Sequence, residues 1–137
     1  MSRFENWFIW WLTSVDDTYA FKIALYFVDH VLFMQTQAIV HHNHVLALGQ
    51  EMKNKKIEGR AYAAIGHASR CLYNLERAQT CHEKELELAL KAQDKKAEAR
   101  ACSSLGNVYQ SNGDVDAALK LHKQHLALSE GNFRVKG

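Results

Sequence analysis

The chain repeats itself with a period of forty residues. The segment Lys56–Ala61 (KIEGRA) is answered by Lys96–Ala101 (KAEARA), and Gly66 is answered by Gly106. Other residues recur in the same register: His42, His82 and His122; Leu46, Leu86 and Leu126; Leu48, Leu88 and Leu128. A period of this size, with small and apolar residues at the recurring positions, predicts stacked helical hairpins that bury their apolar faces against one another. Stacks of this kind typically present an extended surface for binding other proteins.

The composition agrees with a helical protein and excludes several functions. Proline is absent, so no helix interior carries its penalty of about 3 kcal/mol. The net charge is only +2, with 17 basic and 15 acidic residues interspersed, which gives no sign of a nucleic-acid or anionic-lipid ligand. The three cysteines, at positions 71, 81 and 102, form no CxxC pair. That pattern favours a reducing compartment and a packing role for the thiols.

The period also predicts where the elements lie. Residues 56–95 and 96–130 each form one complete repeat, residues 35–55 form the second helix and connector of an incomplete one, and residues 131–137 form a tail. The sequence Asn112-Gly113-Asp114 predicts a turn between helices, with Asp114 as the cap of the next one. We expect the last helix to end before Glu130-Gly131. The prediction is an all-α fold of about six helices, a short right-handed solenoid of antiparallel hairpins with helices over 56–72, 76–92, 96–112 and 115–130.

Small residues at fixed positions predict how the repeats pack. Gly66 and Gly106 weaken a helix interior by about 1 kcal/mol each, so their recurrence indicates that a neighbour approaches too closely for a Cβ. Ala38, Ala78 and Ala118 recur at a second packing position.

The first 34 residues do not follow the repeat. Tyr26 stands where the repeat has glycine, although Phe21, Leu25, Val28 and Leu32 share one helical face and predict a helix around 17–34. One interpretation is a surrogate first helix packed on residues 36–53, capping the stack. The other is that an unrelated N-terminal sequence has replaced the usual one.

A membrane role for this segment rests on its aromatic start. Trp7, Trp10 and Trp11 lie in an apolar run. Because Asp16-Asp17, Lys22 and Asp29 interrupt the apolar sequence, we expect no membrane span. A peripheral anchor formed by the tryptophans stays an alternative.

The histidines and cysteines do not form a convincing reaction centre. His41, His42 and His44 cluster, but no HExxH pattern or acidic partner accompanies them. His42, His82 and His122 stand on successive helices, too far apart to share one ion. Cys81 and His82 are sequence neighbours and diverge on a helix. We therefore expect no enzyme activity, no metal and no cofactor.

The repeat resembles the tetratricopeptide repeat family in its forty-residue form, over about residues 36–130. It is most similar to long multi-repeat members and, more distantly, to the Leu-Gly-Asn repeat adaptors of spindle orientation. The residues that carry the resemblance are Glu58-Gly59-Arg60-Ala61-Tyr62, Ile65-Gly66, Ala78, His82, Leu86 and Leu88, then Glu98, Arg100-Ala101, Leu105-Gly106-Asn107-Val108-Tyr109, Gly113-Asp114, Ala117-Ala118-Leu119 and His122 to Leu128.

The resemblance implies a concave groove, lined by the first helices, that holds a partner peptide. Its usual contact positions are occupied here by Arg60 and Arg100, by Ser104, and by His67 and Asn107. We expect the two arginines to contact carboxylates or carbonyls of a partner, because their planar forks suit that task. The alternative is that they bridge to Glu58, Glu98 or connector carbonyls and only hold the repeats together.

These observations favour a non-catalytic adaptor or scaffold segment that binds a protein or peptide. The resemblance implies a cytoplasmic location and a link to the spindle, the cytoskeleton or cell division. An alternative is a truncated isoform that self-associates, or caps a longer tetratricopeptide repeat protein, through its exposed end.

Overall fold

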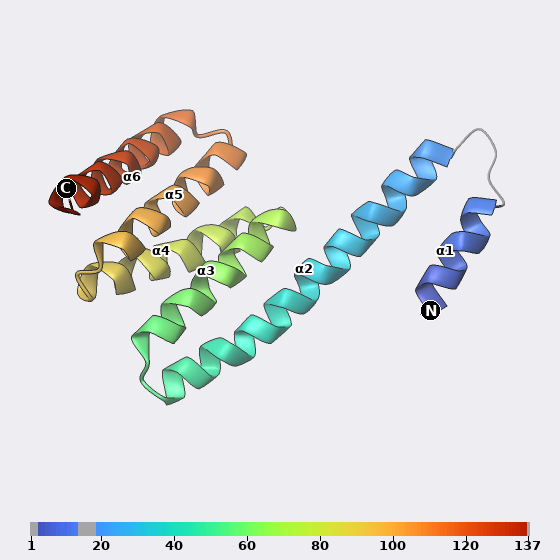
Figure 1. The fold of residues 1–137 in the computed structure, drawn as a ribbon, viewed down its shortest axis with the longest axis horizontal. Helices are drawn as coiled ribbons and strands as arrows, with labels where there is room; N and C mark the ends of the chain where they lie inside the picture. The colour runs from blue at the N-terminus through green and yellow to red at the C-terminus, as the bar shows by residue number, and fades with distance from the viewer. Residues whose placement is uncertain (1–2, 14–18, 137) are drawn as a thin grey trace. The chain divides into compact units, whose positions relative to one another are not determined.

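The computed structural model describes residues 3–13 and 19–136, and within them it contains six α-helices and no strand. The predicted all-α fold is confirmed. The chain divides into two compact units, Met1–Met34 and Gln35–Gly137. The helices are α1 (Arg3–Thr13), α2 (Tyr19–Glu51), α3 (Lys55–Cys71), α4 (Leu75–Lys91), α5 (Lys95–Ser111) and α6 (Val115–Lys136) (Figure 1).

The helices that follow α2 begin at intervals of twenty residues, at Lys55, Leu75, Lys95 and Val115. Each helix from α3 onwards begins after an Asn or Asp whose side-chain oxygen accepts a hydrogen bond from the backbone N–H three residues later, at 3.1–3.2 Å. This satisfies one of the amides that a helix start leaves without a partner. These caps are Asn54, Asn74, Asp94 and Asp114. The predicted turn at Asn112-Gly113-Asp114 is confirmed, because α5 ends at Ser111 and α6 begins at Val115.

The residue before each cap takes a left-handed backbone conformation. The φ angles are 52° at Lys53, 61° at Tyr73, 53° at Gln93 and 85° at Gly113. This conformation reverses the chain and lets the cap's own N–H bond back into the preceding helix, as Asn74 does to the Ser69 carbonyl at 2.8 Å. Only Gly113 adopts it without steric cost, since a Cβ disfavours positive φ.

The helix predicted around residues 17–34 does not end at residue 34, because helix α2 runs without interruption from Tyr19 to Glu51. The physical reason is the missing turn signal. Phe33 and Met34 stand where later turns have a left-handed residue and a cap, and Met34 offers no acceptor for an N-terminal amide.

Helices α3 to α6 pack as consecutive hairpins. Helix α3 contacts α4, α4 contacts α5 and α5 contacts α6, while α3 and α5 also touch. The core between them contains Ile65, Cys102 and Val108, each at most 1% exposed. Since α3 and α5 are the first helices of their hairpins, their contact aligns equivalent faces of successive repeats. This arrangement is a helical hairpin solenoid.

Helix α6 extends beyond its predicted end. The sequence predicts a stop before Glu130-Gly131, yet the helix backbone continues to Lys136. A single glycine costs a helix only about 1 kcal/mol. Gly131 is followed by Asn132, a residue type that caps α3 and α4, and the helix backbone nevertheless continues.

One segment of the described residues, Phe21–Glu51 in α2, has the length and composition of a membrane-crossing helix. Its most apolar window of eighteen residues has a mean hydropathy of 1.4, and no residue of that window is buried. The charged side chains Lys22 and Asp29 do not exclude the segment, since a candidate span can contain up to two charged residues. This finding concerns length and composition alone.

Candidate functional site

A groove with a volume of ≈ 540 Å³ lies in the repeat array, where the first helices of two successive hairpins face each other. Helices α3 and α5 supply most of its walls, and α4 contributes Leu88 and Ala89. Its ionisable lining residues are Lys55, Lys56, Arg60, His67, Glu85, Asp94, Arg100 and His125. We call this cavity the groove. Its walls combine an apolar floor with an excess of basic groups.

Arg60 and Arg100 occupy equivalent positions on α3 and α5, one repeat apart, and both are exposed in the groove. Within the described part of the chain, neither guanidinium makes a hydrogen bond or ion pair. Glu58 and Glu98, the carboxylates that would hold the arginines in a structural role, are engaged elsewhere. The two forks are therefore available to a ligand.

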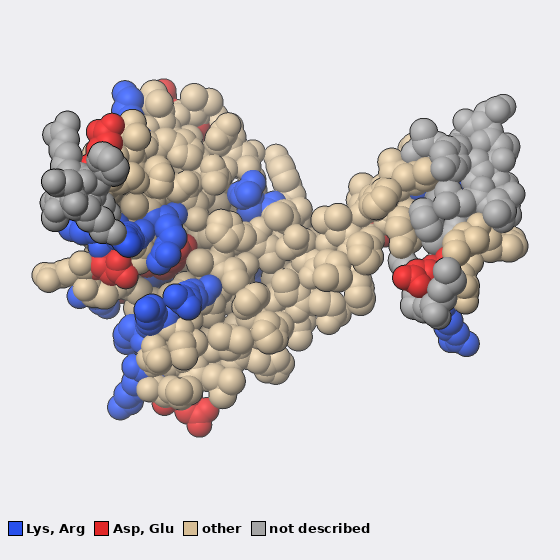
Figure 2. Space-filling view, in the orientation of Figure 1, with Lys and Arg blue, Asp and Glu red and all other residues tan. Residues whose placement is uncertain are grey.

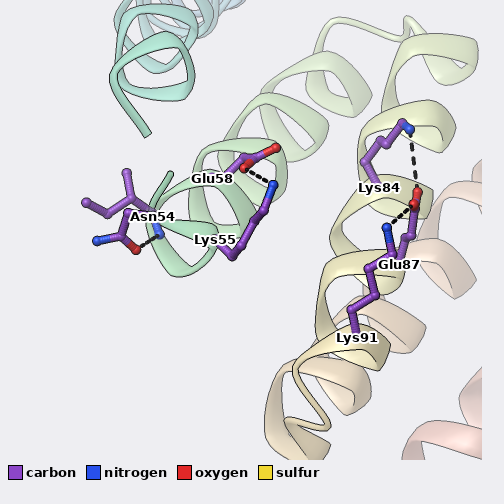
Figure 3. A network of polar contacts seen from close by, with 7 residues as sticks. Asn54, Lys55, Glu58, Lys84, Glu87 and Lys91 are labelled. Carbon is purple, nitrogen blue, oxygen red and sulfur yellow. Dashed lines mark hydrogen bonds and ion pairs between the residues drawn. The ribbon is translucent and has the colours of Figure 1, made fainter. Parts of the chain in front are cut away.

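Lysines take the carboxylates instead. Lys55 Nζ lies 3.2 Å from Glu58 Oε2 (Figure 3). Lys95 Nζ lies at the same distance, 3.2 Å, from Glu98 Oε2, so the pairing repeats with the sequence. Both carboxylates are almost fully buried. Each i,i+3 pair lets a nearly buried carboxylate keep a charged partner at the surface.

The second charged network in Figure 3 lies on α4. Glu87 accepts hydrogen bonds from Lys84 at 3.4 Å and Lys91 at 3.0 Å. These hydrogen bonds and the two positive charges hold the pKa of Glu87 below its usual value. The cluster does not line the groove. It is a solvated helix face, and exposed pairs of this kind contribute little to stability.

The two acidic groups of the groove are already satisfied. Glu85 Oε2 lies 2.8 Å from His82 Nδ1, and Asp94 accepts the Ala97 N–H at 3.1 Å as the cap of α5. Lys56, Arg60 and Arg100 carry charges that no described carboxylate balances. Figure 2 shows Lys and Arg side chains gathered over the N-terminal parts of α3 and α5. The groove therefore favours an anionic ligand.

His67, which lines the groove, contacts a second histidine, His82. The rings of His67 and His82 meet edge to face with their centroids 5.0 Å apart. Partial burial and the neighbouring His82 lower the pKa of His67 from its usual value of 6.5, while Glu85 acts in the opposite direction. His82 is fully buried, and its Nε2 has no hydrogen-bond partner among the described residues.

The structure brings together four of the five predicted contact residues. Arg60, His67, Arg100 and Ser104 all line the groove, although Ser104 is buried. Asn107 is half-buried and lies outside the lining. Sequence reasoning missed Lys55, Lys56 and His125. The doublets Lys55-Lys56 and Lys95-Lys96, repeated at the forty-residue period, are the signal that could have identified the lysines.

The predicted packing residues lie inside the array, with one exception. Ala78 and Ala118 are buried, whereas Ala38 on α2 is half-buried. A Cβ at Gly66 would lie 2.5 Å from His82 Nε2, and one at Gly106 would lie 2.7 Å from His122 Cε1. The side chain that approaches each glycine is thus the recurring histidine of the partner helix.

The thiols and histidines offer little chemistry. Burial raises the pKa of the Cys81 and Cys102 thiols, which keeps them protonated and poorly nucleophilic. Among the described residues, no group of three or more His, Cys, Asp or Glu side chains could hold a metal ion.

Comparison with known families agrees with the repeat. A family model described as tetratricopeptide repeat matches residues 101–135, from within α5 to the end of α6. No curated protein matches the chain. The family match supports a tetratricopeptide repeat, a class of domain that generally binds protein partners and is generally non-catalytic.

Proposed function

We propose that this chain, part of which matches a tetratricopeptide repeat, is a non-catalytic adaptor or scaffold segment that binds a partner's peptide in the groove. The observation that carries the proposal is the pair of exposed guanidiniums, Arg60 and Arg100, that no described residue engages. They stand one repeat apart on facing helices. Their ligands are carboxylates or carbonyls of an acidic peptide laid along the groove.

Physical chemistry favours a carboxylate over a neutral group. An arginine fork can take a carboxylate through two parallel hydrogen bonds. A hydrogen bond to a charged group contributes about 1.5–3 kcal/mol. Lys56 adds a third unbalanced charge, and the floor at Leu88 and Ala89 offers contact for an apolar side chain. A peptide that alternates acidic and small apolar residues fits these walls.

The family resemblance extends the proposal to a place in the cell. Its residues, such as the Leu105-Gly106-Asn107 run, resemble those of spindle-orientation adaptors. We therefore propose a cytoplasmic scaffold associated with the spindle or cytoskeleton. This step rests on analogy with the family and not on the geometry of the groove.

The experiment is affinity capture from cell lysate with the full chain and with an Arg60→Glu, Arg100→Glu double variant. Peptides from the captured proteins are then titrated against both chains by calorimetry. We expect the double variant to lose roughly a hundredfold or more in affinity, because two charge-assisted contacts become repulsions.

The matched control is Lys120→Glu, Lys123→Glu, which changes the net charge equally on exposed residues of α6 outside the groove. It should retain every partner and affinity. Circular dichroism must first show equal helicity in all three proteins. Equal loss of partners in both variants would indicate a general charge effect, and unchanged capture by the arginine variant would refute the groove.

A further inference from the structure

The N-terminal half of α2 exposes a large apolar surface. Phe21 is 67% exposed and Phe33 60% exposed. Six more apolar side chains in the same segment are each exposed by more than 40%: Leu25, Phe27, Val28, Val31, Leu32 and Met34. The face that the sequence predicts to be buried, which includes Phe21, Leu25 and Val28, is thus open. An apolar surface of this extent usually marks an interaction site.

The distribution of these side chains around the helix indicates what covers them. At about 100° per residue, the apolar positions from Ile23 through Val31 to Leu25 occupy an arc of about 200°, and Phe33 lies outside it, on the side of Lys22 and Asp29. Lys22 and Asp29 lie two turns apart on the opposite edge. A helix that docks on a protein groove usually has a narrower apolar stripe. A medium that closes around most of the circumference, as lipid does, fits the wide arc better.

The length of the segment determines how it would meet a bilayer. Residues 35–51 of α2 belong to the unit that contains the repeats. The fourteen residues from Phe21 to Met34 extend for about 21 Å, less than the ≈ 30 Å of a hydrocarbon core. Crossing would also place the Asp29 carboxylate at the costly centre of the bilayer. Lying in the interface keeps the edge formed by Lys22 and Asp29 in water.

We propose that Phe21–Met34 inserts in the plane of a lipid bilayer surface, with its apolar arc toward the acyl chains. Trp7 and Trp10 of α1, 50% and 64% exposed, belong to the same unit and have the side chain that favours the headgroup level.

Charge makes the proposal specific. Residues 1–34 contain two basic residues, Arg3 and Lys22, and four acidic ones: Glu5, Asp16, Asp17 and Asp29. This segment is therefore net negative, while the remainder of the chain is net positive. Insertion by the apolar arc needs no anionic lipid and resists salt. Adsorption through the basic groove would need anionic lipid and would weaken as salt rises.

The test is flotation of the full chain with phosphatidylcholine vesicles, and with vesicles that also contain phosphatidylserine, at ~0.05 M and ~0.5 M salt. We expect flotation with both vesicles at both salt concentrations. A Val28→Lys, Val31→Lys variant, altered at the centre of the arc, should lose roughly tenfold or more of its vesicle binding. The control Asp29→Lys, His30→Lys places its lysines away from that centre and should float as the parent does.

Three outcomes would overturn the proposal. They are failure to float with phosphatidylcholine, flotation that requires phosphatidylserine and disappears at high salt, and equal flotation of the Val28→Lys, Val31→Lys variant. Sedimentation of the chain without vesicles tests whether a second copy of the protein covers the apolar arc instead. A dimer that this variant dissociates, in a chain that does not float, would assign the arc to a second copy. All four substituted positions are exposed, so circular dichroism should show unchanged helicity.

Discussion

At the scale of single residues, the same packing contact recurs in each repeat: a glycine on one helix faces a histidine ring on the next. His82 packs against Gly66, and His122 packs against Gly106. His82 is fully buried, with Nδ1 bound to Glu85 and its Nε2 edge over the glycine. The ring therefore has little freedom to move away from an added methyl group.

Gly66→Ala should destabilise the fold by about 1–3 kcal/mol, although alanine is the better helix former. The matched substitution is Gly59→Ala in the same helix, where a Cβ would meet only Leu88 Cδ1, at an ordinary 3.9 Å. That change should stabilise by about 0.5–1 kcal/mol. Urea unfolding of both variants measures the change in the free energy of unfolding, which should have opposite signs. Stabilisation by Gly66→Ala would mean that the His82 ring moves aside for the added methyl group at little cost.

His67 should make stability depend on pH. Its pKa is lowered in the folded chain by partial burial and by His82, so the unfolded chain takes up the proton first as the pH falls. The contribution of neutral His67 is complete above the unfolded pKa of about 6.5 and is lost as the pH falls through the lower folded pKa.

A His67→Gln variant should therefore lose less stability than the parent between about pH 7.5 and pH 5.5. Urea unfolding at both values measures the difference. Parallel loss of stability in the two proteins would contradict the assignment to His67.

At the scale of helices, the boundaries are local devices. A left-handed residue followed by an Asn or Asp cap ends one helix and starts the next at twenty-residue intervals. Where Phe33 and Met34 take these two places, the chain continues as one helix. The caps were visible in the sequence, and their absence at Met34 was the signal that α2 would not break.

Asn74→Ala should destabilise the array by about 1 kcal/mol, because it removes the acceptor for the Arg77 N–H at the start of α4. Thermal unfolding monitored by circular dichroism measures the loss. Gln110→Ala, at an exposed site within α5, is the control and should change stability by less than about 0.5 kcal/mol. Equal effects of the two substitutions would show that the cap is not what stabilises α4.

At the scale of the whole molecule, the two compact units differ in charge and in surface. Residues 35–137 contain the basic groove, whereas residues 1–34 are acidic overall and expose aromatic and aliphatic side chains. The two proposed activities therefore use separate surfaces and opposite physical forces. Salt weakens the peptide contacts of Arg60 and Arg100 and leaves apolar insertion of Phe21–Met34 intact.

Much of the architecture follows from residues that act on near neighbours. The forty-residue period, the Asp114 cap and the absence of proline predict the four helices of the array, because capping and helix propensity depend on a few consecutive residues. The arginines of the groove could be found in the same way, since Arg60 and Arg100 recur in register.

Tertiary structure alone decides which groups meet. The sequence marks Gly66 and His82 as recurring positions, and only the packed helices show that the His82 ring fills the space that a Cβ at Gly66 would need. The same holds for Asn107, which shares the repeat register yet lies outside the groove lining. Pairing and burial depend on distances between helices, and a linear pattern does not contain those distances.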